Sequence, residues 1–261
     1  MEKEIRIKHP FKTDSVKGDS GCVLVIGGSQ DYVGAPYFTA SGALLTGSDL
    51  VYIFCQKEAL IPLKTLLPEA IVSILSYNEI FLRRIASCII GPGLGILTEE
   101  SESFNIITQI VNYLSVKKIP IVLDGDGLRL YFNKIFKEYP YLILTPNVNE
   151  RKKAVWLEPK HLLIEKGRID IIRLEEHKEL VSEKGLLRRC GGQGDILVGI
   201  LGTFLSWIKD FNNENLIQVA KAACVLTRKA GRLAEEEKGF SVIASDLLKK
   251  IPDVLSEVIY D

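Results

Sequence analysis

The stretch Arg188-Arg189-Cys190-Gly191-Gly192-Gln193-Gly194-Asp195-Ile196-Leu197 is a glycine-rich loop that leads directly into a predicted helix, because apolar residues recur at helical spacing as far as Ile208. Glycines let backbone N–H groups converge, and a helix N-terminus adds a positive dipole end. The stretch is therefore a candidate anion cradle. Asp195 is placed to accept a proton from a hydroxyl group while the N–H groups hold a phosphate. A purely structural interpretation is that Gly192 or Gly194 makes a tight turn and Asp195 caps the helix.

The chain before this loop alternates short apolar runs with helix-compatible segments. Runs of this kind, bounded by Gly, Pro, Asp or Asn, indicate strands that are buried on both faces. Repeated βα units predict an α/β fold with a mainly parallel central sheet and right-handed crossovers. The predicted strands are Cys22–Ile26, Leu50–Cys55, Cys88–Ile90, Pro120–Leu123 and Tyr141–Leu144, and the predicted helices are Ala35–Thr46, Lys57–Leu66, Glu99–Val116 and Leu128–Lys137.

The last hundred or so residues change pattern twice. From His161 to Glu183 short apolar runs alternate with charged turns, which predicts short strands joined by hairpins. Helices are expected over Asn215–Glu236 and after Ser245, a candidate N-cap, with Pro252 kinking the last one. No repeat or linker interrupts the sequence, so we expect a single domain over residues 1–261.

Distinctive residues follow several of the predicted strands. Because ligands bind at the carboxyl ends of parallel strands, these residues should line one rim of the sheet. The segment Gly91-Pro92-Gly93-Leu94-Gly95 resembles a dinucleotide-binding fingerprint, but Ile96 stands where its third glycine belongs, which disfavours a redox Rossmann enzyme. No P-loop motif occurs either. The residues at this rim are Gly27 and Gly28, Gly91–Gly95, Asp124 and Asp126, and Thr145–Asn147.

Two further motifs have both a functional and a structural interpretation. Asp124 and Asp126 could organise Mg²⁺ through water or hold a ribose or an amide, whereas Asp-Gly pairs also simply make turns. The segment Lys166-Gly167-Arg168-Ile169-Asp170 offers two cations beside a glycine, which suits phosphates, but it is also an ordinary hairpin turn.

Composition limits the function classes. The 33 basic residues balance the 33 acidic ones, so no global field favours nucleic acid or an anionic membrane, and any anion must be bound locally. The termini and apolar runs show no signal peptide, transit peptide or membrane span, and widely spaced cysteines are typical of reduced thiols, so we expect a cytoplasmic protein. The three histidines have no ligand at metal spacing, which disfavours a zinc site. The five cysteines are Cys22, Cys55, Cys88, Cys190 and Cys224.

In combination, these motifs resemble the NAD(P)H-hydrate dehydratase family from about Lys17 to the C-terminus. The Arg188–Asp195 loop looks more like the eukaryotic, ATP-using branch than the bacterial, ADP-using branch, which usually has Thr or Ser in place of Gln193. The motifs that carry the resemblance, in order, are Lys17–Asp19, Gly21–Gly28, Gly34–Phe38, Gly91–Gly95, Val122–Leu128, Leu144–Asn147 and Arg188–Asp195.

This resemblance implies a ribokinase-like, three-layer α/β/α fold and a repair reaction. ATP with Mg²⁺ would phosphorylate the ring hydroxyl of (S)-NAD(P)H hydrate, NADHX or NADPHX, and loss of phosphate would restore NAD(P)H. It also implies a homo-oligomer. The resemblance also assigns roles to individual residues. It implies that Asp195 is the catalytic base and contacts substrate, and that the rest of the substrate site comprises Ala35, Gly93, Asn147 and Glu150. The implied nucleotide site comprises Lys166, Gly167, Arg168, Ile169, Asp170, Arg189, Cys190, Gly191, Gly192, Gln193 and Gly194. No metal ligand is assigned.

One segment departs from the family pattern. Only fifteen residues separate Glu150 from Lys166, which is shorter than in relatives and could narrow substrate choice or weaken affinity. Two other functions remain open: a ribokinase-like kinase of a vitamin precursor, and a catalytically silent nucleotide-binding scaffold. The pair Gly34–Phe38 and Gly91–Gly95 favours the dehydratase over the kinase. Retention of Asp195 with the loop glycines argues against the scaffold.

Overall fold

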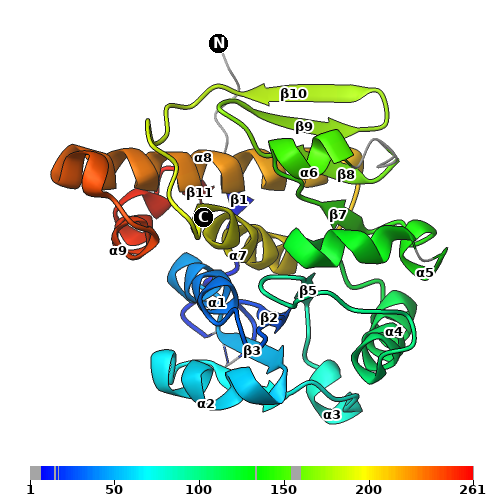
Figure 1. Cartoon of the computed structure of the whole chain (residues 1–261). Helices are drawn as coiled ribbons and strands as arrows, with labels where there is room; N and C mark the ends of the chain where they lie inside the picture. The colour runs from blue at the N-terminus through cyan, green and yellow to red at the C-terminus, as the bar shows by residue number, and fades with distance from the viewer. Residues whose placement is uncertain (1–6, 15, 17, 133, 154–159, 261) are drawn as a thin grey trace.

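A nine-stranded sheet forms the centre of the computed structural model, which describes residues 7–14, 16, 18–132, 134–153 and 160–260 (Figure 1). The strand order is β10-β9-β8-β7-β6-β5-β2-β3-β4. All neighbouring pairs are parallel except β8 with β9 and β9 with β10. The expected mainly parallel sheet is therefore confirmed. Its strands are β2 (Cys22–Ile26), β3 (Leu50–Cys55), β4 (Ile71–Ile74), β5 (Ser87–Ile90), β6 (Ile121–Leu123), β7 (Leu142–Leu144), β8 (Leu162–Glu165), β9 (Asp170–Leu174) and β10 (His177–Val181).

Both faces of the sheet are covered by helices, and strand β2 shows why. All five of its residues are buried: Val23 and Val25 pack into the core on one face, and Leu24 and Ile26 into the core on the other. The first core contains residues of α1 (Gly34–Thr46), α7 (Gln193–Trp207), α8 (Asn213–Lys238) and α9 (Ala244–Leu255), and the second contains residues of α4 (Glu102–Val116). This layering confirms the sheet buried on both faces that the apolar runs predict and the three-layer architecture that the resemblance implies.

The shorter elements complete the two layers and the edges. Helix α2 packs against the edge strand β4, and α5 lies near α4 (Figure 1). A two-stranded parallel sheet joins the two ends of the described chain. These elements are α2 (Lys57–Leu66), α3 (Glu79–Leu82), the 3-10 helix η1 (Gly125–Phe132), α5 (Lys134–Lys137), α6 (Val148–Lys153), the 3-10 helix η2 (Gly239–Ser241), β1 (Ile7–Lys8) and β11 (Ile259–Tyr260).

Several predicted boundaries were wrong. The segment predicted as one helix over 128–137 is a 3-10 helix followed by the short α5. Helix α9 begins at Ala244, with Ile243 rather than Ser245 as its N-cap, because the Asp246 carboxylate accepts a hydrogen bond of 3.2 Å from the Ile243 N–H. The edge strand β4 was not predicted. Part of the shortened segment, residues 154–159, lies outside the described residues.

The fold brings several of the predicted site motifs together at one end of the sheet. Residues that follow the carboxyl ends of β6, β7 and β8 line the same cavity as the first turn of α7. This is the position expected for a ligand site in an open α/β sheet. Among the described residues, the longest apolar helical stretches fall short of what a bilayer span requires.

Candidate active site

The glycine-rich loop ends at Gly192, which forms the N-cap of α7. Its φ of 93° lies in the left-handed region that glycine adopts without a steric penalty. A Cβ atom at this position would lie 2.7 Å from Cβ of Ala244 and 2.8 Å from Cδ2 of Phe38, so a side chain has no room. Asp195 is the third residue of the helix and not its cap. The interpretation of Asp195 as a helix cap is therefore wrong.

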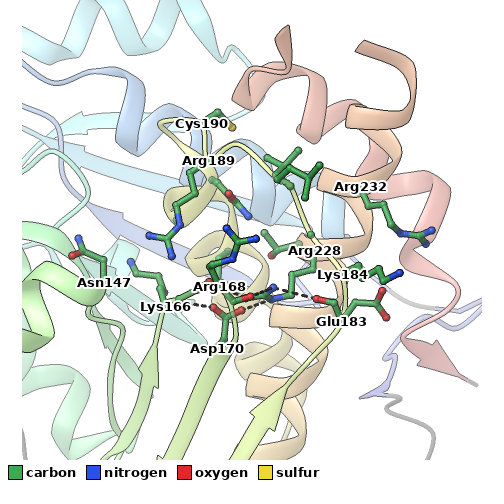
Figure 2. Close-up of a pocket in the computed structure, with 18 of the residues that line it drawn as sticks. Asn147, Lys166, Arg168, Asp170, Glu183, Lys184, Arg189, Cys190, Arg228 and Arg232 are labelled. Carbon is green, nitrogen blue, oxygen red and sulfur yellow. Dashed lines mark hydrogen bonds and ion pairs between the residues drawn. The ribbon is translucent and has the colours of Figure 1, made fainter. Parts of the chain in front are cut away.

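A cavity of about 1100 Å³ opens beside the start of α7, and it collects most of the predicted site (Figure 2). This volume is slightly above the range usual for small-molecule sites, roughly 300–1,000 Å³. Ile169, Gly191 and Gly192 belong to the same loops without lining the cavity, and Ala35 and Gly93 lie outside it. The predicted residues that line it are Asn147, Glu150, Lys166, Gly167, Arg168, Asp170, Arg189, Cys190, Gln193, Gly194 and Asp195.

Lys166 supplies a buried cation to this cavity. Its Nζ atom pairs with the carboxylate of Asp124, which also accepts a hydrogen bond of 2.7 Å from Oγ1 of Thr145. Burial by itself lowers the pKa of Lys166, but the neighbouring carboxylates, first of all Asp124, outweigh it and raise the pKa. A Cβ on Gly194 would lie 3.3 Å from Nζ of Lys166. The cation therefore stays protonated at the mouth of the glycine loop, where it can bind a phosphate.

The pKa of the Asp195 carboxyl group lies close to neutral pH. Burial, and after it the negative charge of Asp124, raise its pKa to about 7, against the opposing effect of the positive charge of Lys166. A general base is most effective when its pKa lies near the working pH. The arrangement therefore allows Asp195 to take a proton from a hydroxyl group at the cavity.

Asn147 and Glu150 cap helix α6 reciprocally. The Oδ1 atom of Asn147 accepts from the N–H groups of Asn149 at 2.9 Å and Glu150 at 3.0 Å. In return, Oε2 of Glu150 accepts from the N–H of Asn147 at 2.7 Å. This is a capping box, which explains the spacing of the two residues in structural terms. Both also line the cavity, so their predicted contact with substrate stays a prediction.

The loop Gly91–Gly95 packs against the start of α1. The carboxylate of Asp126 accepts a hydrogen bond of 3.0 Å from the Gly95 N–H and so holds this loop, while its predicted role in binding a ligand stays a prediction. A Cβ on Gly93 would lie 3.3 Å from Cδ of Pro36. Gly93 therefore lies against the first turn of α1, where Ala35 is also found, so the two predicted substrate residues are neighbours outside the main cavity.

Arg228 of α8 was missed by the sequence analysis. It is buried, lines the cavity, and pairs with Asp170 at 2.6 Å between Nε and Oδ2. The available signal was a cation separated by one residue from the apolar run Ala222–Leu226 of a predicted helix. A charged residue on a buried helix face requires a partner, and the sequence does not identify that partner.

Comparisons with known proteins give one consistent family. The model of a family described as NAD(P)H-hydrate dehydratase matches residues 23–253. An ATP-dependent (S)-NAD(P)H-hydrate dehydratase of Entamoeba histolytica is 37% identical over 272 residues, covering 94% of this chain and 90% of that protein.

Solved structures agree on the fold. The ADP/ATP-dependent NAD(P)H-hydrate dehydratase of Bacillus subtilis, co-crystallised with ATP/Mg²⁺, superposes with a TM-score of 0.74 at 22% identity, covering 96% of this chain and 94% of that one. A ribokinase-like superfamily protein of Enterococcus faecalis gives a TM-score of 0.75 at 20% identity, covering 96% and 92%. At these identities the likeness concerns the fold, and the expected ribokinase-like class is confirmed.

Proposed function

This chain belongs to the NAD(P)H-hydrate dehydratase family, and on that premise we propose that it uses ATP to convert (S)-NAD(P)H hydrate to NAD(P)H in metabolite repair. The observation that supports this most directly is the convergence of Asp195, Lys166 and the glycine loop on one cavity. A carboxylate with a pKa of about 7 beside a buried cation and a helix N-terminus suits phosphoryl transfer to an alcohol.

In the proposed reaction, the hydroxyl oxygen of the hydrated ring attacks the γ-phosphorus of ATP. Asp195 takes the hydroxyl proton as the new O–P bond forms and the bond to the ADP oxygen breaks. The carbon–oxygen bond then breaks with loss of phosphate, a proton leaves the neighbouring ring carbon, and the electron pair of that C–H bond restores the ring double bond. The positive charge of Lys166 and the N–H groups of the glycine loop stabilise the charge on the transferred group.

Mg²⁺ fits this site as a partner of the nucleotide rather than as a fully caged ion. Within the part of the chain that the structure describes, no group of three His, Cys, Asp or Glu side chains could hold a metal. Protein-bound Mg²⁺ with a nucleotide usually takes one or two carboxylates plus phosphate and water oxygens. Glu150 and Asp124 line the cavity and are the candidate carboxylates. The ion would neutralise negative charge on the phosphates.

Two further cations that line the cavity, Arg168 and Arg189, suit the polyphosphate of ATP. Their side chains reach into the cavity with that of Lys166 (Figure 2). Within the described ranges neither arginine forms an ion pair. We therefore assign both, with the loops that carry them, to the nucleotide, and Asn147, Glu150, Ala35 and Gly93 to the hydrated dinucleotide.

We also propose that residues 1–261 act as one domain in the cytoplasm and assemble into a homo-oligomer. The continuous nine-stranded sheet supports the single domain, and the homo-oligomer rests on the family resemblance. Gel filtration with light scattering measures the assembly state, and a monomeric mass would contradict the last part.

The function is tested by following NADH recovery from its hydrate at 340 nm with ATP or ADP and Mg²⁺. We expect ATP to support turnover better than ADP, because the Arg188–Asp195 loop resembles the ATP-using branch. A clear preference for ADP would contradict the branch assignment and leave the reaction standing. No recovery with either nucleotide, together with ATP-dependent phosphorylation of a hydroxyethylthiazole, would contradict the reaction itself.

Replacing Lys166 by Ala is expected to raise the KM for ATP by about tenfold with a smaller loss in kcat. The reason is that a phosphate-binding cation contributes binding energy to the ground state and the transition state alike. Calorimetric titration with ATP provides an independent measurement. Lys178→Ala, which removes an exposed cation from β10, is the control and should behave as the unaltered protein. Unchanged ATP affinity in the Lys166 variant would show that this lysine only neutralises Asp124.

A further inference from the structure

The buried guanidinium of Arg228 is not used by the proposed chemistry, yet it connects three segments around the cavity. Its Nε atom lies 2.6 Å from Oδ2 of Asp170, and the two side chains are only 8% and 9% exposed. The Nη2 atom donates to the carbonyl of Gly167 at 3.0 Å, and Nη1 donates to the carbonyls of Arg168 at 2.8 Å and Glu183 at 3.1 Å. Helix α8 is thereby joined to the β8–β9 turn and to the segment after β10.

These contacts fix the orientation of two successive peptide groups in the turn. In a trans peptide the carbonyl and the following N–H point in opposite directions, and the described chain contains no cis peptide. Because the carbonyls of Gly167 and Arg168 point toward Arg228, the N–H groups of Arg168 and Ile169 point away from it. Neither of these N–H groups donates to any partner in the described part of the protein.

Asp170 completes the turn from the other side. Its Oδ1 atom accepts a hydrogen bond of 2.9 Å from the Gly167 N–H, while its Oδ2 atom binds Arg228. The turn is thus held at one N–H and two carbonyls by a single buried ion pair. The N–H groups of Arg168 and Ile169 are thus left without a partner among the residues that the structure describes. They belong to the same turn as Lys166 and Arg168, which line the cavity here.

We propose that Arg228 is a positioning residue for ATP, which holds the β8–β9 turn so that the N–H groups of Arg168 and Ile169 are free to bind a phosphate. The inference rests on the proposed function, because it takes ATP as the ligand of this cavity. Successive N–H groups that point the same way form an anion-binding site, and holding them in place before binding avoids an ordering cost on binding. Arg228 itself need not touch the nucleotide.

The test compares ATP binding by calorimetry, and KM and kcat, for Arg228→Gln, Arg228→Lys and a matched control. The control is Lys221→Gln, which breaks another ion pair from the same helix to the same hairpin, with Glu179 at 3.0 Å, away from the cavity. All measurements are made well below the melting temperature of each variant. We expect Arg228→Gln to raise the Kd and KM for ATP by at least about tenfold while kcat at saturating ATP changes little.

Arg228→Lys keeps the charge beside Asp170 but cannot reach all three carbonyls, so an intermediate Kd is expected. It also decides the question if the Gln variant does not fold. Lys221→Gln should bind ATP as the unaltered protein does. A lower melting temperature with unchanged Kd and KM in the Arg228 variants would overturn the proposal and leave a structural role only.

Failure of the proposed function gives a different result. An unaltered protein that binds ATP in the calorimeter but recovers no NADH would contradict the reaction. The role of Arg228 would still be decided by the ratio of the Kd for ATP in the Arg228 variants to that in the unaltered protein. An unaltered protein that does not bind ATP would overturn both. A combined Asp170→Asn, Arg228→Gln variant should lose no more affinity than the worse single variant, because each change breaks the same ion pair.

Discussion

Replacing Asp195 by Asn is expected to lower kcat for NADH recovery by at least about a hundredfold while ATP binding persists. The amide has nearly the same size as the carboxyl group but cannot take the proton from the substrate hydroxyl. Glu102→Gln is the matched control, because it also removes an acidic residue from the first turn of a long helix, α4, and should leave kcat unchanged. Near-normal turnover by a folded Asp195→Asn protein would contradict the catalytic assignment.

The pH dependence gives the same prediction a second readout. Burial raises the pKa of Asp195 to about 7, so the base is protonated and inactive below that pH. We expect kcat/KM to rise between about pH 6 and pH 8 in the unaltered protein, and this rise should be absent from the residual activity of the Asn variant.

The stability of the fold should change with pH in the direction opposite to activity, and fall as the pH rises. The folded-state pKa of Asp195 lies above its ordinary value of 3.8, so its contribution to stability is lost as the pH rises from about 4 to about 7. Asp195→Asn removes a buried charge, and its melting temperature at pH 8 should equal or exceed that of the unaltered protein. A marked loss of stability in this variant would show that the carboxylate has a structural role.

Replacing Gly91 by Ala is expected to destabilise the fold by at least about 3 kcal/mol, because the backbone around Gly91 leaves no room for a side chain. Gly91 has a φ of 125°, and a Cβ there would lie 1.8 Å from the carbonyl oxygen of Asp124 and 2.5 Å from the nitrogen of Gly127. Both contacts are with backbone, so neither can be relieved by a change of rotamer. Thermal denaturation should show a melting temperature lower by about 10 °C, and urea denaturation should show a lower midpoint concentration.

Gly95→Ala separates backbone strain from this steric overlap. Gly95 belongs to the same loop and has a φ of 79°, but the nearest atoms to a Cβ lie 3.7 Å away. We expect a cost of roughly 1 kcal/mol, from the left-handed conformation alone. Equal stability of the two alanine variants would contradict the packing argument. Because Gly91 contacts the backbone of Asp124, the Gly91 variant should also bind ATP more weakly.

The central strands were predictable because their burial is a local property of the sequence. Each residue of Cys22–Ile26 is apolar, which only a strand covered on both faces requires. The edge strand β4 was missed for the complementary reason: Ile71 and Ile74 are 37% and 46% exposed, so no uninterrupted buried run marks it. The helix over 128–137 was also misjudged, because apolar spacing does not distinguish a 3-10 turn from an α-helix.

From the sequence we could predict the parallel α/β fold, the glycine loop that begins α7 and Asp195 as a candidate base. These features depend on residues that are neighbours in the chain. The tertiary structure alone decided which charges meet: Lys166 pairs with Asp124 across 42 positions, and Arg228 with Asp170 across 58. The physical reason is that such pairs depend on strand order and helix placement. Apolar periodicity encodes which face of an element is buried, but not which distant element covers it.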